Sequence, residues 1–168
     1  MKTLRLIGMA IIAVIMSVNF VACDDDDEDS NTIDTSSLVG TWGLVRCAGW
    51  EVCSEKTEKE VWEWTNDPFN PDVDSEKIHI EKIAESGYSI SSYYYTGSDW
   101  KYVGAQRGTL NGNTVELQDY EVNFEGNLII ETLTADKLVI RIKYDEMENY
   151  PPNHRDYGEY VNTYTRIN

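Results

Sequence analysis

Cys23 is the residue whose chemical role the surrounding sequence defines best. Lys2 and Arg5 open the chain, an almost unbroken apolar run covers residues 6–21, and Ala22 directly precedes Cys23. This order is typical of a secretory signal, and the run is short for a spanning helix, which needs about 20 apolar residues. We therefore predict a lipoprotein signal peptide over residues 1–22 and lipid attachment at Cys23. An ordinary cleaved signal or an uncleaved anchor is the alternative.

The residues after Cys23 are strongly acidic. An unbroken run of Asp and Glu covers residues 24–29, and Ser, Thr and Asn follow it. We predict that residues 23–37 form a flexible tether. The whole chain has 14 basic and 30 acidic residues, a net charge of −16. Such a charge opposes binding to nucleic acid and to anionic headgroups, so membrane contact is expected through the lipid anchor alone.

Two further cysteines, Cys47 and Cys53, lie close together in the sequence. Disulfides persist in exported domains, and Gly49 between them allows a tight bend. We predict a disulfide between Cys47 and Cys53, with two free thiols as the alternative. Neither cysteine has histidine neighbours at the spacing of a zinc site.

An aromatic-rich segment at residues 48–75 contains Trp50, Trp62, Trp64 and Phe69. Four large aromatic side chains are more than a solvated connection needs. One interpretation is an aromatic clamp over a ligand. The other is a small extra hairpin in which Trp62 and Trp64 only cap the core. The sequence favours the clamp for Trp50 and the cap for the other two tryptophans.

No catalytic arrangement is visible. The two histidines, His79 and His154, lie far apart, and the chain has no nucleophile motif or phosphate-binding glycine loop. An acidic stretch that includes Asp72 and Asp74 has the spacing of a calcium loop, but Ser75 replaces the glycine of its turn. We predict no enzyme activity, no cofactor and no metal site, and leave a looser calcium site at Asp72 and Asp74 open.

Residues 38–168 have the apolar periodicity of strands and enough length for one core. Short turns such as Asn111-Gly112-Asn113 separate the strands, so neighbours in sequence should pair antiparallel. We predict an all-β fold, an eight-stranded antiparallel up-and-down barrel with a long aromatic-rich insertion after the first strand. The expected strands are 40–47, 76–83, 88–95, 100–110, 115–119, 128–133, 138–144 and 157–167.

Alternation along the strands predicts which side chains face the barrel interior. If Trp42 points inward, Leu44 and Arg46 share its face. An inward Arg46 would be a costly buried charge, and the alternative is a bulge that turns it to solvent. Together with the three tryptophans of the insertion, the predicted ligand-binding residues are Tyr94, Tyr102, Ile140 and Tyr144.

The first and last strands resemble a known family. The segment Gly40-Thr41-Trp42 resembles the Gly-x-Trp opening of lipocalins, and more closely that of small bacterial lipocalin-like lipoproteins. Residues 133–140 and the closing segment 164–167 resemble the later strands of those domains. The resemblance implies that Trp42 plugs the closed end of the barrel and that Arg166 lies across its ring. Both roles are structural.

The cysteine followed by acids is similar to the surface-export signal of Bacteroidota lipoproteins. This resemblance implies a lipid anchor at the outer face of the outer membrane. The expected function is non-enzymatic binding of a small hydrophobic or amphipathic ligand inside the barrel. The alternative is a filled barrel that acts as an interaction or glycan-binding module in a surface assembly with protein partners.

Overall fold

The computed structural model describes residues 35–53, 58–118, 127–148 and 154–167. A short 3-10 helix, η1 (Thr35–Ser37), precedes the strands. The strands are β1 (Gly40–Val52), β2 (Glu60–Thr65), β3 (Glu76–Lys82), β4 (Gly87–Tyr95), β5 (Trp100–Asn111), β6 (Thr114–Leu117), β7 (Leu128–Leu133), β8 (Lys137–Glu148) and β9 (His154–Ile167). Cys23 and the acidic tether lie outside the described residues. Among the described residues, no helix is long and apolar enough to cross a membrane.

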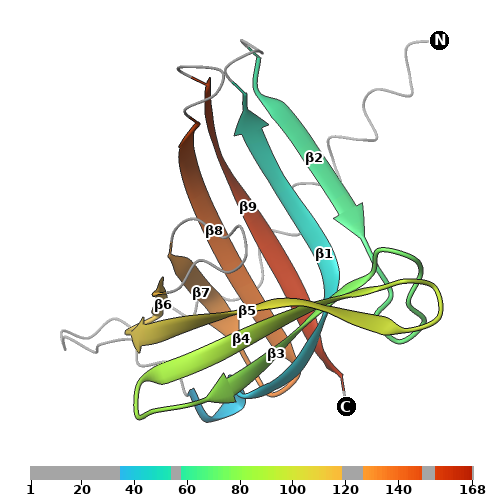
Figure 1. Cartoon of the computed structure of the whole chain (residues 1–168), viewed down its shortest axis with the longest axis vertical. Coiled ribbons are helices and arrows are strands. Elements are labelled where there is room, and N and C mark those ends of the chain that lie inside the picture. The colour runs from blue at the N-terminus through green and yellow to red at the C-terminus, as the bar shows by residue number, and fades with distance from the viewer. Residues whose placement is uncertain (1–34, 54–57, 119–126, 149–153, 168) are drawn as a thin grey trace, which may run out of the picture.

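The strands form one antiparallel sheet that closes on itself. Their order is β2-β1-β3-β4-β5-β6-β7-β8-β9, and β1 also pairs with β9 (Figure 1). The closed barrel therefore consists of eight strands, β1 and β3 to β9, with β2 as an additional strand. The predicted all-β, eight-stranded up-and-down barrel with an insertion after its first strand is confirmed, because each barrel strand pairs antiparallel with the next barrel strand along the chain and β1 pairs with β9.

Strand β1 pairs with two different strands along one of its edges, and we call the point where the partner changes the fork. Its first part pairs with β3, from Gly40 opposite Ile80 to Gly43 opposite Lys77. Its second part pairs with β2, from Arg46 opposite Thr65 to Glu51 opposite Glu60. The other edge of β1 pairs with β9 along its length. The aromatic-rich insertion thus forms an extra hairpin with β1, which is the arrangement that the capping interpretation required.

A bulge in β1 lies at the fork. The register against β9 shifts between Leu44 and Arg46. An extra residue in one strand turns the following side chains to the opposite face. Arg46 consequently points outward, where its Nε donates to a Glu63 oxygen at 2.8 Å, and Cys47 takes the inward position. The alternative given for Arg46, a bulge that turns it to solvent, is correct.

The predicted disulfide between Cys47 and Cys53 is wrong. Cys47 lies inside β1 and Cys53 follows its last residue, and neither is in a disulfide. Gly49 makes no bend, because it continues the strand opposite Trp62 and Tyr160. Six residues of extended strand separate the two Cα atoms by about 20 Å, whereas a disulfide requires about 4.4–6.8 Å.

The closed end of the barrel is filled by side chains around Trp42. Trp42 is 0% exposed, and its indole Nε1 donates to the Leu38 carbonyl at 2.9 Å. The Arg166 guanidinium lies 4.1 Å from the Trp42 ring centroid, so the contact implied by the family resemblance is present. The core cluster that contains Trp42 also includes Leu38, Leu44, Ile78, Ile80, Tyr88, Ile90, Val115, Leu128, Ile130, Leu138, Ile140, Ile142 and Tyr164.

Arg166 also joins three segments of the closed end through backbone carbonyls. Its Nη1 donates to Val39 at 2.9 Å, its Nη2 donates to Ser37, and its Nε donates to Ala135 at 2.5 Å. Because the planar guanidinium presents several donors in fixed directions, one side chain can satisfy carbonyls that the strands leave unpaired. The cation–π contact and these hydrogen bonds close the barrel base.

Candidate ligand-binding pocket

A pocket of about 370 Å³ lies at the fork, where β1 leaves β3 and joins β2. Its volume falls in the range of small-molecule sites, about 300–1,000 Å³. Six strands contribute to it. The lining residues are Leu44, Cys47, Trp62, Trp64, Glu76, Lys77, Ile78, Ser92, Tyr93, Tyr94, Val103, Tyr160, Asn162 and Tyr164.

One wall of the pocket is aromatic. Trp62 and Trp64 alternate along β2, and they are opposite Gly49 and Cys47 of β1. Tyr160 and Tyr164 extend the wall from β9, and the rings of Trp62 and Tyr160 lie 5.9 Å apart at a 42° tilt. This distance is normal for interacting aromatic rings, so the wall is a packed surface.

Asn162 lies between the two tyrosines on the same face of β9. Its Nδ2 donates to the Tyr164 hydroxyl at 3.1 Å, and both residues are buried. The Asn162 Oδ1 atom is buried without a hydrogen-bond partner among the described residues. Desolvation raises the pKa of the Tyr164 hydroxyl, which is therefore a neutral group at physiological pH. The β9 side thus combines apolar ring faces with uncharged polar atoms.

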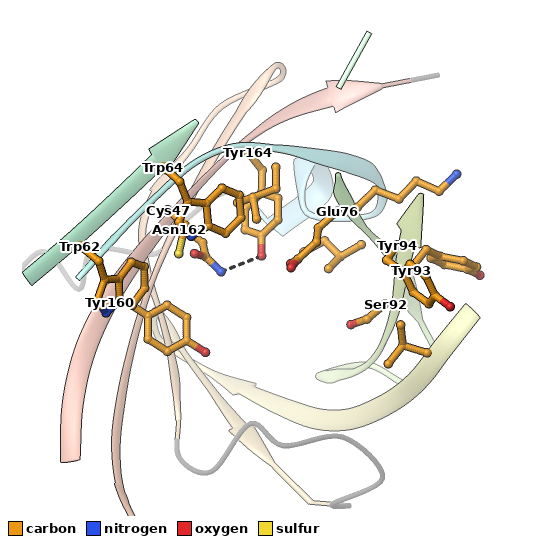
Figure 2. A pocket seen from close by; sticks show the side chains of 14 residues that line it. Cys47, Trp62, Trp64, Glu76, Ser92, Tyr93, Tyr94, Tyr160, Asn162 and Tyr164 are labelled. Atoms are coloured by element: carbon orange, nitrogen blue, oxygen red, sulfur yellow. Dashed lines mark hydrogen bonds between the residues drawn. The ribbon is translucent and has the colours of Figure 1, made fainter. Parts of the chain in front are cut away.

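The opposite side of the pocket carries Glu76, the first residue of β3. Alternation places Glu76 on the same inward face as Ile78 and Ile80. Figure 2 shows its carboxylate and the hydroxyl groups of Tyr160, Tyr164 and Ser92 pointing toward the same space.

Glu76 is exposed, yet the surrounding protein raises its pKa. The cause is desolvation, with a smaller effect from the negative charge of Asp74. The exposure and the raised pKa are consistent, because the carboxylate faces the pocket, where protein atoms replace part of its hydration.

The β4–β5 hairpin forms the edge of the pocket. Ser92, Tyr93 and Tyr94 come from β4, where the register against β5 shifts between Ser92 and Tyr93. Tyr93 and Tyr94 lie on the far side of Ser92 from Tyr160 (Figure 2).

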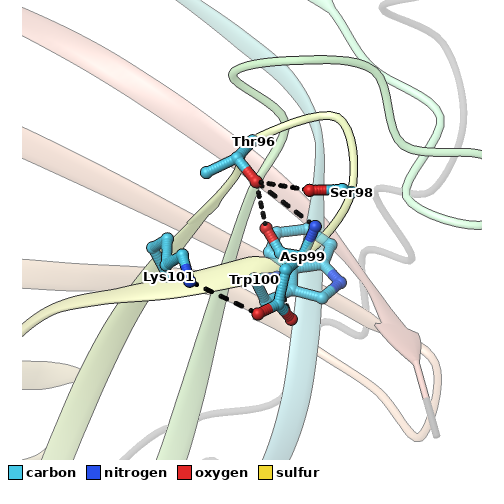
Figure 3. Close-up of polar contacts among 5 residues, drawn as sticks. All are labelled: Thr96, Ser98, Asp99, Trp100 and Lys101. Atoms are coloured by element: carbon cyan, nitrogen blue, oxygen red, sulfur yellow. Dashed lines mark hydrogen bonds and ion pairs between the residues drawn. The ribbon is translucent and has the colours of Figure 1, made fainter.

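The turn of this hairpin is held by Thr96 and Asp99 (Figure 3). The Thr96 hydroxyl donates to the Asp99 carbonyl at 3.0 Å, and the backbone N–H of Trp100 donates to the Asp99 carboxylate at 2.9 Å. Trp100 then packs beside Tyr95, with ring centroids 5.3 Å apart. These local bonds fix the hairpin that carries the pocket edge.

Three of the predicted ligand-binding residues line the pocket, namely Trp62, Trp64 and Tyr94. Trp50 does not. It packs edge-to-face on Tyr157, with centroids 6.2 Å apart, under the Lys59 ammonium at 4.0 Å. Because Trp50 is opposite Val61 in β2, it lies on the outer face.

The other three predicted residues also lie outside the lining. Tyr102 is 58% exposed and packs against Tyr93. Ile140 belongs to the filled core. The Tyr144 hydroxyl donates to Glu51 at 3.1 Å, and its ring lies 6.2 Å from that of Tyr160, so Tyr144 packs beside a residue of the pocket wall.

Cys47 is the one thiol in the described lining. It is 4% exposed, and burial raises the pKa of its thiol to about 12. A thiol with this pKa is protonated at neutral pH and is a poor nucleophile. Among the described residues, no three His, Cys, Asp or Glu side chains gather closely enough to hold a metal ion.

Sequence reasoning missed Glu76, Ser92, Tyr160 and Asn162. Alternation contained the signal for two of them, because Glu76 shares parity with Ile78 and Asn162 shares parity with Tyr164. A polar residue in phase with a buried row is the pattern that marks a site inside a barrel.

No family model and no curated protein matches this sequence significantly. Two siderocalin structures are similar to the chain. Ex-FABP, described as having dual ligand specificities, has a TM-score of 0.46 at 10% identity, over 78% of this chain and 71% of its own. Q83, described as having a dual ligand binding mode, has a TM-score of 0.45 at 13% identity, over 80% and 73%.

Japanin from Rhipicephalus appendiculatus, solved with cholesterol, is also similar to the chain. Its TM-score is 0.41 at 14% identity, over 77% of this chain and 75% of its own. Likenesses this distant carry no argument about ligands. The barrel architecture follows from the strand pairing of the chain itself.

Proposed function

We propose that this chain is a surface-anchored bacterial lipoprotein whose barrel binds a small apolar or amphipathic ligand. The pocket at the fork of β1 is the observation that supports binding. It combines aromatic faces with a few polar groups directed into one space, which is the usual composition of a small-molecule site. Binding is favoured over catalysis because the Cys47 thiol is held protonated.

The alternative is a filled barrel that serves as an interaction or glycan-binding module. The closed end around Trp42 is filled, but the fork encloses space, which favours a ligand inside the barrel. Exposed aromatic side chains outside the pocket, such as Phe69 at 72% and Tyr102 at 58%, keep a surface interaction as the second candidate.

The binding proposal is tested with a chain that begins at residue 24. All nine strands and the core lie within residues 35–167, so this chain retains the whole barrel. N-phenyl-1-naphthylamine, a neutral apolar fluorophore, is titrated while its emission is followed. We expect saturable enhancement, and about tenfold weaker binding in Trp62→Ala because a ring face is lost.

Trp50→Ala is the matched control, because it removes the same side chain from the outer face of the same hairpin. Its affinity for the fluorophore should equal that of the unsubstituted chain. Absence of saturable binding in the unsubstituted chain would overturn the pocket proposal, and equal losses in both variants would move the site away from the fork.

The anchor proposal is supported by Cys23 and the acids that follow it. In a bacterial host that exports such lipoproteins, an alkyne-bearing fatty acid should label the full chain, and Cys23→Ala should abolish the label. Cys53→Ala is the control and should keep it. Replacing residues 24–29 by serine should leave the chain lipidated but protected from protease added to intact cells. Unchanged labelling of Cys23→Ala would contradict the anchor.

A further inference from the structure

Two carboxylates near the pocket differ in their hydrogen-bond partners. Glu51, on the same inward face of β1 as Cys47 and Gly49, accepts a hydrogen bond from the Tyr144 hydroxyl. The Glu76 carboxylate has no ion pair or side-chain hydrogen bond with any described residue. The surrounding protein removes part of the hydration of this carboxylate, and an opposite charge would compensate that loss. Glu76 can therefore gain free energy by pairing with a group that enters the pocket.

The charged surroundings of Glu76 favour a positively charged partner. Lys77 is the one basic residue of the described lining, and its Nζ lies 4.3 Å from the ring centroid of Trp100, on the outer face of the sheet. It does not neutralise Glu76, and the nearest acid, Asp74, adds negative potential. With the acidic net charge of −16, the field at the fork attracts cations.

The wall opposite Glu76 has the complementary chemistry. The rings of Trp64 and Tyr160 lie on the other side of the pocket from the carboxylate, and the Tyr164 hydroxyl is drawn beside it (Figure 2). The face of an aromatic ring carries partial negative charge and attracts ammonium groups, most strongly where water is excluded. A cation between these rings and Glu76 would meet negative potential from both sides, while its apolar body would contact Trp62 and Ile78.

We propose that the ligand of this pocket carries an ammonium group, which docks between the Glu76 carboxylate and the rings of Trp64 and Tyr160. This inference rests on the proposed ligand-binding function and names its ligand class, an amphipathic amine. A neutral sugar or alcohol is the competing class, because hydroxyl groups also bind carboxylates and aromatic faces.

The test compares two probes that differ only in their heads, 4-phenylbutylamine and 4-phenylbutan-1-ol. Each is titrated at pH 7.5, where the amine is charged, against the chain from residue 24 loaded with N-phenyl-1-naphthylamine. We expect the amine to displace the fluorophore at a concentration at least about tenfold below that of the alcohol. Glu76→Gln should remove this preference, because loss of the negative charge weakens amine binding more than alcohol binding.

Glu81→Gln is the charge-matched control. Glu81 lies on the same strand but faces outward, where one of its oxygens is 3.3 Å from a His79 nitrogen. It should retain the amine preference. Equal displacement by the two probes in the unsubstituted chain would overturn the ammonium inference, even if Glu76→Gln failed to fold. In that case fluorophore binding still supports the pocket, whereas loss of fluorophore binding itself would refute the proposed function.

Discussion

The two ends of the barrel differ in whether their polar side chains have hydrogen-bond partners. At the closed end, the Trp42 indole and the Arg166 guanidinium donate to backbone carbonyls and stack on each other. At the fork, the Glu76 carboxylate and the Asn162 Oδ1 have no such partners among the described residues. The pair that seals the closed end is therefore hydrogen-bonded, whereas the fork presents two acceptor groups beside a hollow space.

The difference arises from how β1 is paired. Between Gly40 and the bulge, β1 lies between β3 and β9, and inward side chains from neighbouring strands fill the narrow barrel. Beyond the bulge, β2 replaces β3 as the neighbour of β1, and large aromatic side chains line a pocket that they do not fill. A buried polar group without a partner is costly, which makes the fork the half where a ligand can gain free energy.

Cys47 gives the largest expected effect and measures how closed the inner part of the fork is. Burial raises its pKa to about 12, so the thiolate is scarce at pH 8 in the folded state and plentiful after unfolding. We expect alkylation of Cys47 by N-ethylmaleimide to be on the order of a thousandfold slower in the folded chain than in urea. Peptide mass mapping separates Cys47 from Cys53. Comparable rates in both states would place Cys47 in open water.

Trp42→Ala should strongly destabilise the closed end. It leaves a cavity and removes the partner of the Leu38 carbonyl, so we expect a loss of about 3–5 kcal/mol in the free energy of unfolding by urea. Trp64→Ala removes the same side chain at the fork, where Trp64 is 36% exposed, and should cost about 1 kcal/mol. Similar losses would show that the two ends do not differ in packing.

Gly40→Ala tests the backbone of the closed end. Gly40 has φ of +141°, which side-chain-bearing residues rarely adopt, and an added Cβ would collide with the Arg166 guanidinium. We expect a loss of about 1–3 kcal/mol in the free energy of unfolding. Gly112→Ala is the control, because Gly112 has φ of +61° in a hairpin turn with open space around it. An equal loss in both variants would mean that the collision with Arg166 adds nothing to the cost of the positive φ.

The sequence predicted the barrel well because period-two alternation and turn residues are local signals. The turn at Asn111-Gly112-Asn113 was predicted from its residue types alone, whereas the sealing pair Trp42 and Arg166 was predicted from the resemblance of the first and last strands to lipocalins. The predicted strand positions correspond to the eight observed barrel strands, which extend further mainly in β1, β8 and β9.

The pocket was harder to predict because it depends on one register shift. Alternation from Trp42 would place Arg46 and Trp50 inward, but the bulge after Leu44 reverses the phase and directs Cys47 inward instead. A shift of one residue moves every later side chain to the other face. Trp50 therefore lies on the outer face of β1. The pairing of β2 with the part of β1 after the bulge places Trp62 and Trp64 on the inner face.

Glu76→Gln gives the smallest expected effect on stability and examines the fork directly. Desolvation and Asp74 raise the pKa of Glu76 above its ordinary value of 4.5, so the folded state holds its proton more tightly than the unfolded state. The stability associated with that proton is present below pH 4.5 and is lost as the pH rises through the folded pKa. Glu76→Gln, which cannot lose a proton there, should match the unsubstituted chain at pH 4 and be slightly more stable at pH 7.

Urea unfolding at the two pH values measures the difference, and Glu81→Gln corrects for the lost surface charge. Equal stability at pH 7 would mean that the carboxylate of Glu76 is well hydrated or paired in the folded state, and the contrast between the two ends would then be one of packing alone. A gain at pH 7 that disappears when 4-phenylbutylamine is added would show that the bound amine compensates the carboxylate, since a ligand that favours the ionised folded state removes the same penalty that the amide removes.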